Sequence, residues 1–323
     1  MPWRCLQTAL RKANMKTVVP PVMACLGCLF VLAQSGRAQV NISFEYTFDT
    51  GFLSGNATAQ ADLQAAANAL AGRLTDSLSA ITPSGQNSWS ATFSNPTTGT
   101  QQSVNNLSVP ANTIVIYIGA RDLGASTLGL GGFGGFNASG TQSWADLISQ
   151  RGQAGAPNTD FGPWGGSISF NNTTSWYFDS DPSTVDVPGG QSDFYSVALH
   201  ELGHVLGIGT ATSWNNKISG GQFTGAASVA AHGGTPVPLD ASGGHWANGT
   251  TSTLPGTSTL QEAAMDPSLT VGTRKLFTDL DFAGLTDVGW QVTPVPEPEQ
   301  YALVAALGLL SFLIYRRRLL QTP

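Results

Sequence analysis

The chain has 323 residues, of which 41 % are hydrophobic and 11 % are charged, so it is long enough to bury a substantial core. Residues 39–295 carry six basic and 18 acidic side chains, a formal charge of −12. This charge argues against nucleic-acid binding, because it repels phosphate backbones. All three cysteines lie within the first 28 residues, so a chain cleaved beyond them can form neither a disulfide nor a cysteine metal site.

The N-terminal residues 1–38 are typical of a secretory signal peptide. A basic start precedes an apolar stretch over 18–33, and the small residues Gly36 and Ala38 follow it. We therefore expect cleavage after Ala38 and export of the remaining chain. An uncleaved membrane anchor is the alternative, and it would also place the body outside the cytoplasm.

The next segments predict strands and one helix. Residues 40–48 alternate apolar and polar side chains, which predicts a half-buried strand. Leucines at helical spacing predict a helix over 57–80, with a cap at 55–56. The continuous apolar run 113–118 predicts a central strand, and the glycine cluster 129–135 predicts a loop.

Two short strands are predicted at 167–170 and 176–178. The first is a candidate for the edge strand along which an extended substrate pairs through its backbone. Strand, helix and strands in this order indicate an α+β fold. Three acidic side chains follow that could hold Ca²⁺, although a solvated acidic loop is the simpler interpretation: Asp179, Asp181 and Asp186.

The segment 192–209 carries the strongest chemical signal. His200 and His204 are four residues apart, so on a helix they lie on one face and can bind one metal ion. Neutral imidazole is a good zinc ligand, and zinc lowers the pKa of its bound water to about 7. Glu201 follows the first histidine, where its carboxylate can take the proton of that water.

The helix that carries these residues is expected to begin at Ser192 or Asp193 and to end at Gly207. In the compact form of the motif a third histidine follows Gly207 by three positions. Thr210 occupies that position here, so the compact form is absent.

A catalytic zinc site needs a third protein ligand and an open position. Glu262 is a candidate for this third ligand because a downstream glutamate is the third ligand of thermolysin-like sites. It is the only glutamate between Glu201 and Glu297. The residues alone leave four candidates for the third ligand: His232, Asp240, His245 and Glu262.

Three segments resemble the C-terminal half of leishmanolysin-like metzincins: LDASGGHWANG, QEAAMDPSLTVG and FTDLDFAGLTDVGW. In that family HExxHxxG is followed by His-Trp, a methionine turn and a helix that ends in Asp-x-Gly-aromatic. The resemblance covers about 190–290 and favours His245 over Glu262. It implies the zinc ligands His200, His204 and His245, the general base Glu201, and Met265 in the turn beneath the metal.

The same resemblance implies a metzincin-like zinc protease domain over 39–293. Its expected parts are a mixed twisted sheet, an active-site helix and a mostly irregular C-terminal subdomain that ends in a helix. We therefore expect an exported zinc endopeptidase that acts on protein or peptide substrates, with Glu201 as general base. The alternative is an inert structural or adhesive surface protein, which the low-charge composition rich in Gly, Ser and Thr also favours.

The C-terminal residues 294–323 resemble the PEP-CTERM sorting signal of Gram-negative bacteria. Pro-Glu-Pro at 296–298 precedes an apolar run over 301–315, and three arginines follow at 316–318. The resemblance implies processing by an exosortase and delivery to the cell surface or extracellular matrix. Membrane contact is expected only through the terminal segments, and a plain tail anchor is the alternative.

Overall fold

The computed structural model describes residues 39–294, 309, 311, 312 and 316. The signal peptide expected for 1–38 and nearly all of the sorting segment expected for 294–323 lie outside the described residues. Within the described part of the chain, no helix has the length and apolar character needed to cross a membrane.

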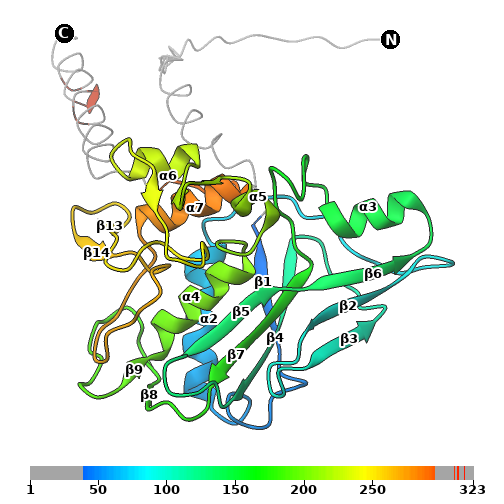
Figure 1. Cartoon of the computed structure of the whole chain (residues 1–323), viewed down its shortest axis with the longest axis horizontal. Helices are drawn as coiled ribbons and strands as arrows, with labels where there is room; N and C mark the ends of the chain where they lie inside the picture. The colour runs from blue at the N-terminus through cyan, green and yellow to red at the C-terminus, as the bar shows by residue number, and fades with distance from the viewer. Residues whose placement is uncertain (1–38, 295–308, 310, 313–315, 317–323) are drawn as a thin grey trace, which may run out of the picture. The chain divides into compact units, whose positions relative to one another are not determined.

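A mixed four-stranded sheet lies at the centre of the fold (Figure 1). Its strands, in spatial order, are β1 (Asn41–Glu45), β4 (Thr113–Arg121), β7 (Gly165–Asn171) and β5 (Gly129–Phe133). The first three are parallel, whereas β5 pairs antiparallel with β7 and forms one edge. Strand β4 is buried on both faces, because Ile114 and Ile116 join one core while Val115 and Tyr117 join the other. The central strand predicted at 113–118 is therefore confirmed.

The two faces of this sheet are covered differently. The helices α2 (Ala57–Ala71) and α4 (Phe194–Val205) share the larger core with one face. The smaller core, on the other face, includes residues of a second sheet and of α3 (Gln142–Gln150), and the ring of Phe93 stacks on that of Tyr117 at 4.3 Å. The strands of this second sheet, in spatial order, are β3 (Gln101–Asn105), β2 (Ser88–Ser94) and β6 (Gly135–Ser139).

The chain after α4 consists mainly of loops and short elements. Helices and several small sheets occur together in the described chain, which is therefore an α+β fold. Trp290, just after the helix Asp279–Val288, donates from Nε1 to the carbonyl of Leu206 at 2.7 Å and so ties this region to the end of α4. The short elements of this region are α5 (Thr212–Asn215), β10 (Ile218–Ser219), β11 (Gln222–Phe223), α6 (Ala226–Ala231), β12 (Val237–Pro238), β13 (Thr251–Thr253), β14 (Leu260–Glu262) and α7 (Asp279–Val288).

The helix predicted over 57–80 is shorter than expected. Asn56 caps it as predicted, since its side chain accepts a hydrogen bond from the amide of Ala59 at 3.1 Å. The helix ends at Ala71, before Gly72, which has a low helix propensity. The apolar spacing continues because Leu74, Leu78 and Ile81 are all buried, but they follow an irregular path.

The prediction of a loop at 129–135 is wrong. This segment forms β5 and the beginning of β6, because its glycines leave room for close packing rather than for turns. A Cβ added at Gly129 or Gly131 would collide with Glu201 on α4. The strand can therefore approach the helix only where side chains are missing.

The edge-strand prediction for 167–170 is also wrong. These residues belong to β7, which lies between β4 and β5 and has both of its edges paired. The strand at 176–178 is reduced to the two-residue β8 (Trp176–Tyr177), paired with β9 (Ser192–Asp193).

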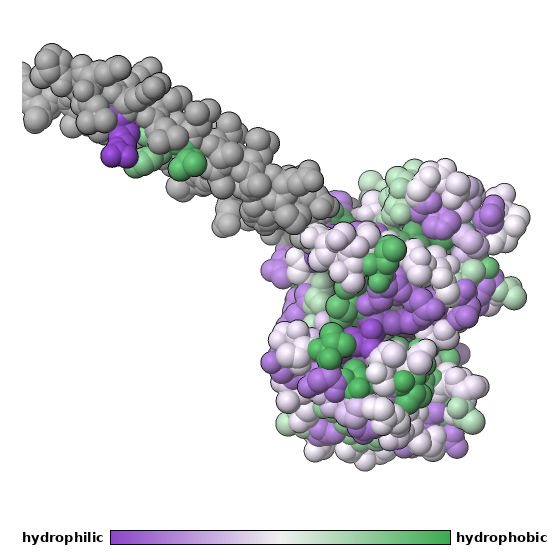
Figure 2. All heavy atoms as spheres, turned by 90° about the vertical axis from the view of Figure 1, so that its left-hand side faces the viewer, coloured by the Kyte–Doolittle hydropathy of each residue, from purple (hydrophilic) through white to green (hydrophobic). Residues whose placement is uncertain are grey.

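Figure 2 shows the hydrophobic side chains of one face as small patches among hydrophilic ones.

Candidate metal centre

Helix α4 carries two of the predicted ligands. Asp193 begins the helix, since its side chain accepts a hydrogen bond from the amide of Ser196 at 3.1 Å. The helix stops just before Gly207, whose φ of 104° is a left-handed conformation that favours glycine. Both ends therefore lie as the sequence predicts, and His200 and His204 are on one face of a buried helix.

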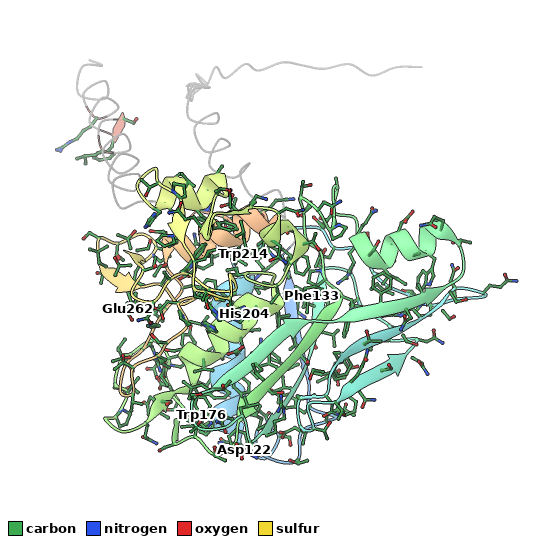
Figure 3. All side chains as sticks on the ribbon, viewed as in Figure 1. Asp122, Phe133, Trp176, His204, Trp214 and Glu262 are labelled. Atoms are coloured by element: carbon green, nitrogen blue, oxygen red, sulfur yellow. The ribbon has the colours of Figure 1, made fainter. Side chains whose placement is uncertain are left out.

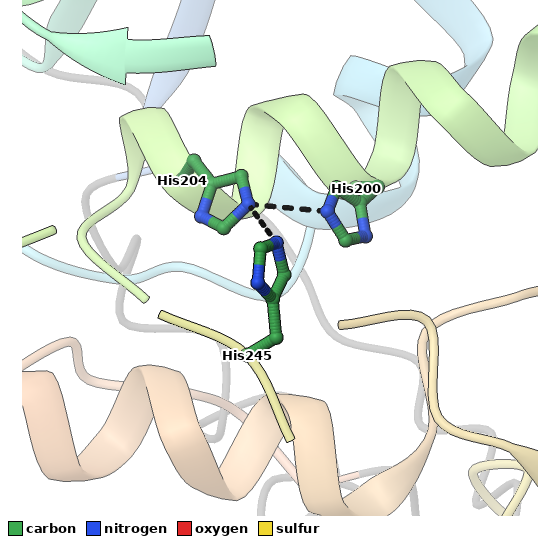
Figure 4. Close-up of side chains that lie close together, drawn as sticks. All are labelled: His200, His204 and His245. Carbon is green, nitrogen blue, oxygen red and sulfur yellow. Dashed lines mark hydrogen bonds between the residues drawn. The ribbon is translucent and has the colours of Figure 1, made fainter. Parts of the chain in front are cut away.

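Three histidine side chains converge at one point (Figure 4). The Nε2 atom of His204 lies 3.1 Å from Nε2 of His200 and 3.0 Å from Nε2 of His245. These side chains could hold a metal ion together, and no other group of three or more His, Cys, Asp or Glu side chains in the described residues could do so. Zinc–nitrogen bonds of about 2.0–2.1 Å at tetrahedral angles place the ligand nitrogens about 3.3 Å apart. The observed spacing is close to that value.

Each of these histidines has an oxygen atom beside its other ring nitrogen. Nδ1 of His200 lies 2.7 Å from the carbonyl of Ala264, and Nδ1 of His204 lies 2.9 Å from the carbonyl of Ile208. Nδ1 of His245 lies 3.3 Å from Oδ2 of Asp240. An oxygen acceptor places the ring proton on Nδ1 and leaves the Nε2 lone pair free. Three such lone pairs that face one point need a cation between them, so the residues fit a bound metal ion.

Burial keeps the imidazoles of His200 and His204 neutral. It lowers the pKa of His200 to about 4, although the hydrogen bond to Ala264 opposes the shift. It also lowers the pKa of His204 well below its usual value, and the neighbouring histidines add to the effect. Neutral imidazole is the form that binds a metal ion, so these two histidines are in their binding form at neutral pH.

Glu201 lies beside the three histidines, between α4 and the edge strand β5. Its Oε2 accepts a hydrogen bond from the amide of Gly131 at 2.6 Å, and the residue is 5 % exposed. Burial raises the pKa of Glu201 to about 8, and the Gly131 bond opposes this shift. A bound divalent cation would lower this pKa again, since it stabilises a nearby negative charge.

A cleft of about 670 Å³ opens over these residues. Strand β5 forms one wall, and its residue Leu130 is 50 % exposed. The segment after Met265 forms the opposite wall and includes Leu269 and the exposed Val271. His200, Glu201, His204 and His245 all line this cleft.

Met265 lies directly behind the metal-binding face of α4. It is fully buried, and a Cβ at Gly203 would collide with its Sδ. Gly203 is on the helix between the two histidines, so the methionine packs against the part of α4 that carries them. Its neighbour Ala264 supplies the carbonyl that faces His200.

The other candidate ligands lie elsewhere. Glu262 is on β14 and pairs with Lys275 at 2.8 Å, away from His204 in Figure 3. His232 is half-buried at the end of α6 and contacts Thr235. Asp240 is beside the site but faces the outer nitrogen of His245, so it orients a ligand rather than acting as one.

The three aspartates considered for Ca²⁺ do not face one point. Asp179 is 2 % exposed and pairs with Arg274 at 2.8 Å. Asp186 accepts a hydrogen bond from the hydroxyl of Tyr177 at 2.9 Å, and Asp181 accepts one from Ser183. These partners take the place that a calcium ion would need, and the buried Asp179 does not fit a solvated loop either.

The sequence interpretation missed the backbone groups that orient the site. The amide of Gly131 and the carbonyls of Ala264 and Ile208 each contact Glu201 or a histidine. Backbone groups are the same in every residue, so no side-chain pattern indicates them. Only the spacing of Gly129 and Gly131 was a usable signal, because two small residues on one strand face mark a close approach.

Comparison of the chain with protein-family models, curated proteins and solved structures finds no match in any of the three. The cluster of three histidines does not by itself identify a family. Its geometry is nevertheless specific enough to limit the chemistry that the site can support.

Proposed function

We propose that the protein is an exported zinc-dependent endopeptidase of the metzincin type. The observation that carries this proposal is the convergence of three Nε2 atoms, from His200, His204 and His245, beside the carboxylate of Glu201 in an open cleft. Three protein ligands leave one position of a tetrahedral metal open, which is the arrangement of catalytic rather than structural zinc. The mixed sheet, the active-site helix and the methionine turn agree with this type of enzyme.

In the proposed mechanism the chain's own groups bind, orient and move a proton. When bound, zinc supplies a Lewis acid that polarises the scissile carbonyl and acidifies water. Glu201 takes a proton from the attacking water and gives it to the leaving amine. The Gly131 amide holds Oε2 of Glu201 at 2.6 Å, which leaves Oε1 as the oxygen that exchanges the proton.

Strand β5 is the proposed docking edge for the substrate backbone. In an antiparallel pair the amide and the carbonyl of one residue point to the same side. Because the Gly131 amide points away from β7 toward Glu201, its carbonyl also faces the cleft side and can accept from a substrate amide. Leu130 and Val271 give the two walls an apolar contact for substrate side chains. These features favour an extended peptide over a small amide.

The test compares Glu201→Gln with the wild type. We expect the variant to retain one zinc per chain and to lose hydrolysis of casein and of a fluorogenic peptide. Chelator treatment of the wild type should abolish hydrolysis, and added zinc should restore it. A zinc-loaded wild type that cleaves no substrate in a broad peptide library would favour the inert surface protein, and an active Glu201→Gln variant would refute the mechanism.

The third ligand is tested by zinc content. His245→Ala should bind zinc much more weakly than the wild type, while Glu262→Ala should bind it normally because Glu262 pairs with Lys275. His232→Ala is the matched control, since it removes a histidine that lies outside the three-histidine cluster. Equal zinc content in His245→Ala and His232→Ala would refute the proposed ligand set.

A further inference from the structure

We infer that Asp281, on α7, is a positioning residue for the metal centre and holds the two segments that orient His200 and His245. The inference rests on the proposed function, because it concerns zinc binding. Asp281 is fully buried, and its carboxylate contacts neither a histidine nor the cleft. It therefore acts on the ligands through their neighbours.

The Asp281 carboxylate accepts five hydrogen bonds from three separate parts of the chain. Oδ2 accepts from the amide of Ala264 and from the amide and hydroxyl of Thr278, each at 2.8 Å. Oδ1 accepts from the amide of Met265 at 3.1 Å and from Nε1 of Trp246 at 2.9 Å. The Thr278 bonds form the capping box at the beginning of α7. The other three bonds join the helix to the methionine turn and to the segment of His245.

The first connection leads to His200. Asp281 binds the amide of Ala264, and the carbonyl of the same residue lies 2.7 Å from Nδ1 of His200. Asp281 thus determines where the orienting oxygen of His200 lies. The neighbouring Met265 amide is held by the other carboxylate oxygen, so the whole turn beneath α4 is attached to one side chain.

The second connection leads to His245. Trp246 is its direct neighbour in the chain, and Nε1 of Trp246 donates to the Asp281 carboxylate at 2.9 Å. The Trp246 amide donates to the Met265 carbonyl at 3.1 Å, so the turn and the His245 segment are also joined to each other. The ring of Trp246 is fully buried and packs on Trp214, which prevents it from rotating away. His245 is therefore attached to the same carboxylate that orients His200.

Two acceptor oxygens are used at this position. All five partners of Asp281 are donors, and in the described residues no basic side chain pairs with it. An asparagine has one acceptor oxygen, and its amide group would face donors. Asp281→Asn keeps the size of the side chain but cannot satisfy both the turn and Trp246.

The same helix offers a matched control. Asp287 is also nearly buried and accepts hydrogen bonds from the amides of Ala227 and Ser228, at the beginning of α6. It contacts neither the methionine turn nor the segment of His245. Asp287→Asn therefore perturbs another buried carboxylate of α7, which accepts two backbone hydrogen bonds, without touching the metal centre.

The experiment measures zinc affinity by competition with a chromophoric chelator, together with the visible spectrum of the cobalt-substituted protein. We expect Asp281→Asn to weaken zinc binding about 10–100-fold, as is usual when a group that orients metal ligands is lost. Its cobalt spectrum should also change, because the ligand geometry changes. Asp287→Asn should keep the wild-type affinity within about twofold and the wild-type spectrum, although its melting temperature should fall.

Three results would overturn the inference. The first is a folded Asp281→Asn variant with wild-type zinc affinity and spectrum, and the second is an equal loss of affinity in Asp287→Asn. If Asp281→Asn does not fold, Trp246→Phe removes one donor to Asp281 and keeps a buried ring. A Trp246→Phe variant with unchanged affinity is then the third overturning result. A wild type that binds no zinc would instead refute the proposed function, and the inference with it.

Discussion

Replacing Gly131 by alanine tests whether the edge strand must be free of side chains next to the general base. An added Cβ at this position would lie 2.9 Å from Cβ and 3.0 Å from the carbonyl carbon of Glu201. It would also collide with the Glu201 carbonyl oxygen. These atoms belong to the helix backbone and its first side-chain atom, so they cannot rotate out of the way, and β5 must move away from α4.

The expected cost has two parts. Forcing one extra carbon into packed structure costs about 1–3 kcal/mol of unfolding free energy. Moving the strand also weakens the bond from the Gly131 amide to the Glu201 carboxylate, a type of bond worth about 1.5–3 kcal/mol. If half of that second amount, about 0.75–1.5 kcal/mol, is lost in the transition state, kcat/KM falls about 3–12-fold, since 1.4 kcal/mol corresponds to a factor of ten.

The assay pairs urea denaturation with hydrolysis of a fluorogenic peptide, and Gly132→Ala is the control on the same strand. A Cβ at Gly132 meets no atom of the described chain within 4 Å. This variant should therefore be as stable as the wild type or more stable by about 0.4–1 kcal/mol, because alanine restricts the unfolded chain. Equal stability of Gly131→Ala and Gly132→Ala would refute the packing argument, whatever the activity of either variant.

Two further predictions concern the buried charges near the start of α4. Burial raises the pKa of Asp62 to about 7, against about 3.9 in an unfolded chain, so the wild type should lose stability as pH rises from about 4 to about 7. Asp62→Asn should remove this dependence and raise the melting temperature at pH 8 more than at pH 5; an unchanged pH dependence would contradict the assignment. Arg274 pairs with Asp179 at 2.8 Å and with Asp193 at 2.7 Å, so Arg274→Met leaves two buried carboxylates unpaired and should cost about 3–5 kcal/mol in urea denaturation. The more exposed Lys217→Met should change stability by less than about 0.5 kcal/mol, and similar losses in both variants would contradict the role of Arg274.

The features that depend on residues close together in the chain follow directly from the sequence. His200 and His204 share a helix face because they are four residues apart, and this relation holds wherever the helix packs. Asp193 and Gly207 mark the ends of that helix by their own capping chemistry and backbone freedom. The burial of β4 on both faces likewise follows from its unbroken apolar run.

The contacts between residues far apart in the chain become visible only in the folded protein. His245 reaches His204 across 41 positions, Ala264 reaches His200 across 64, and Gly131 reaches Glu201 across 70. The residues alone leave four candidates for the third ligand, among which the resemblance favours His245, and the path of the chain after α4 brings His245 rather than Glu262 to His204. The glycines of β5 predict a loop because a missing side chain shows no periodicity, and their use becomes visible only when α4 packs against them. Contacts of this kind depend on how loops close over the whole domain, which local spacing does not encode.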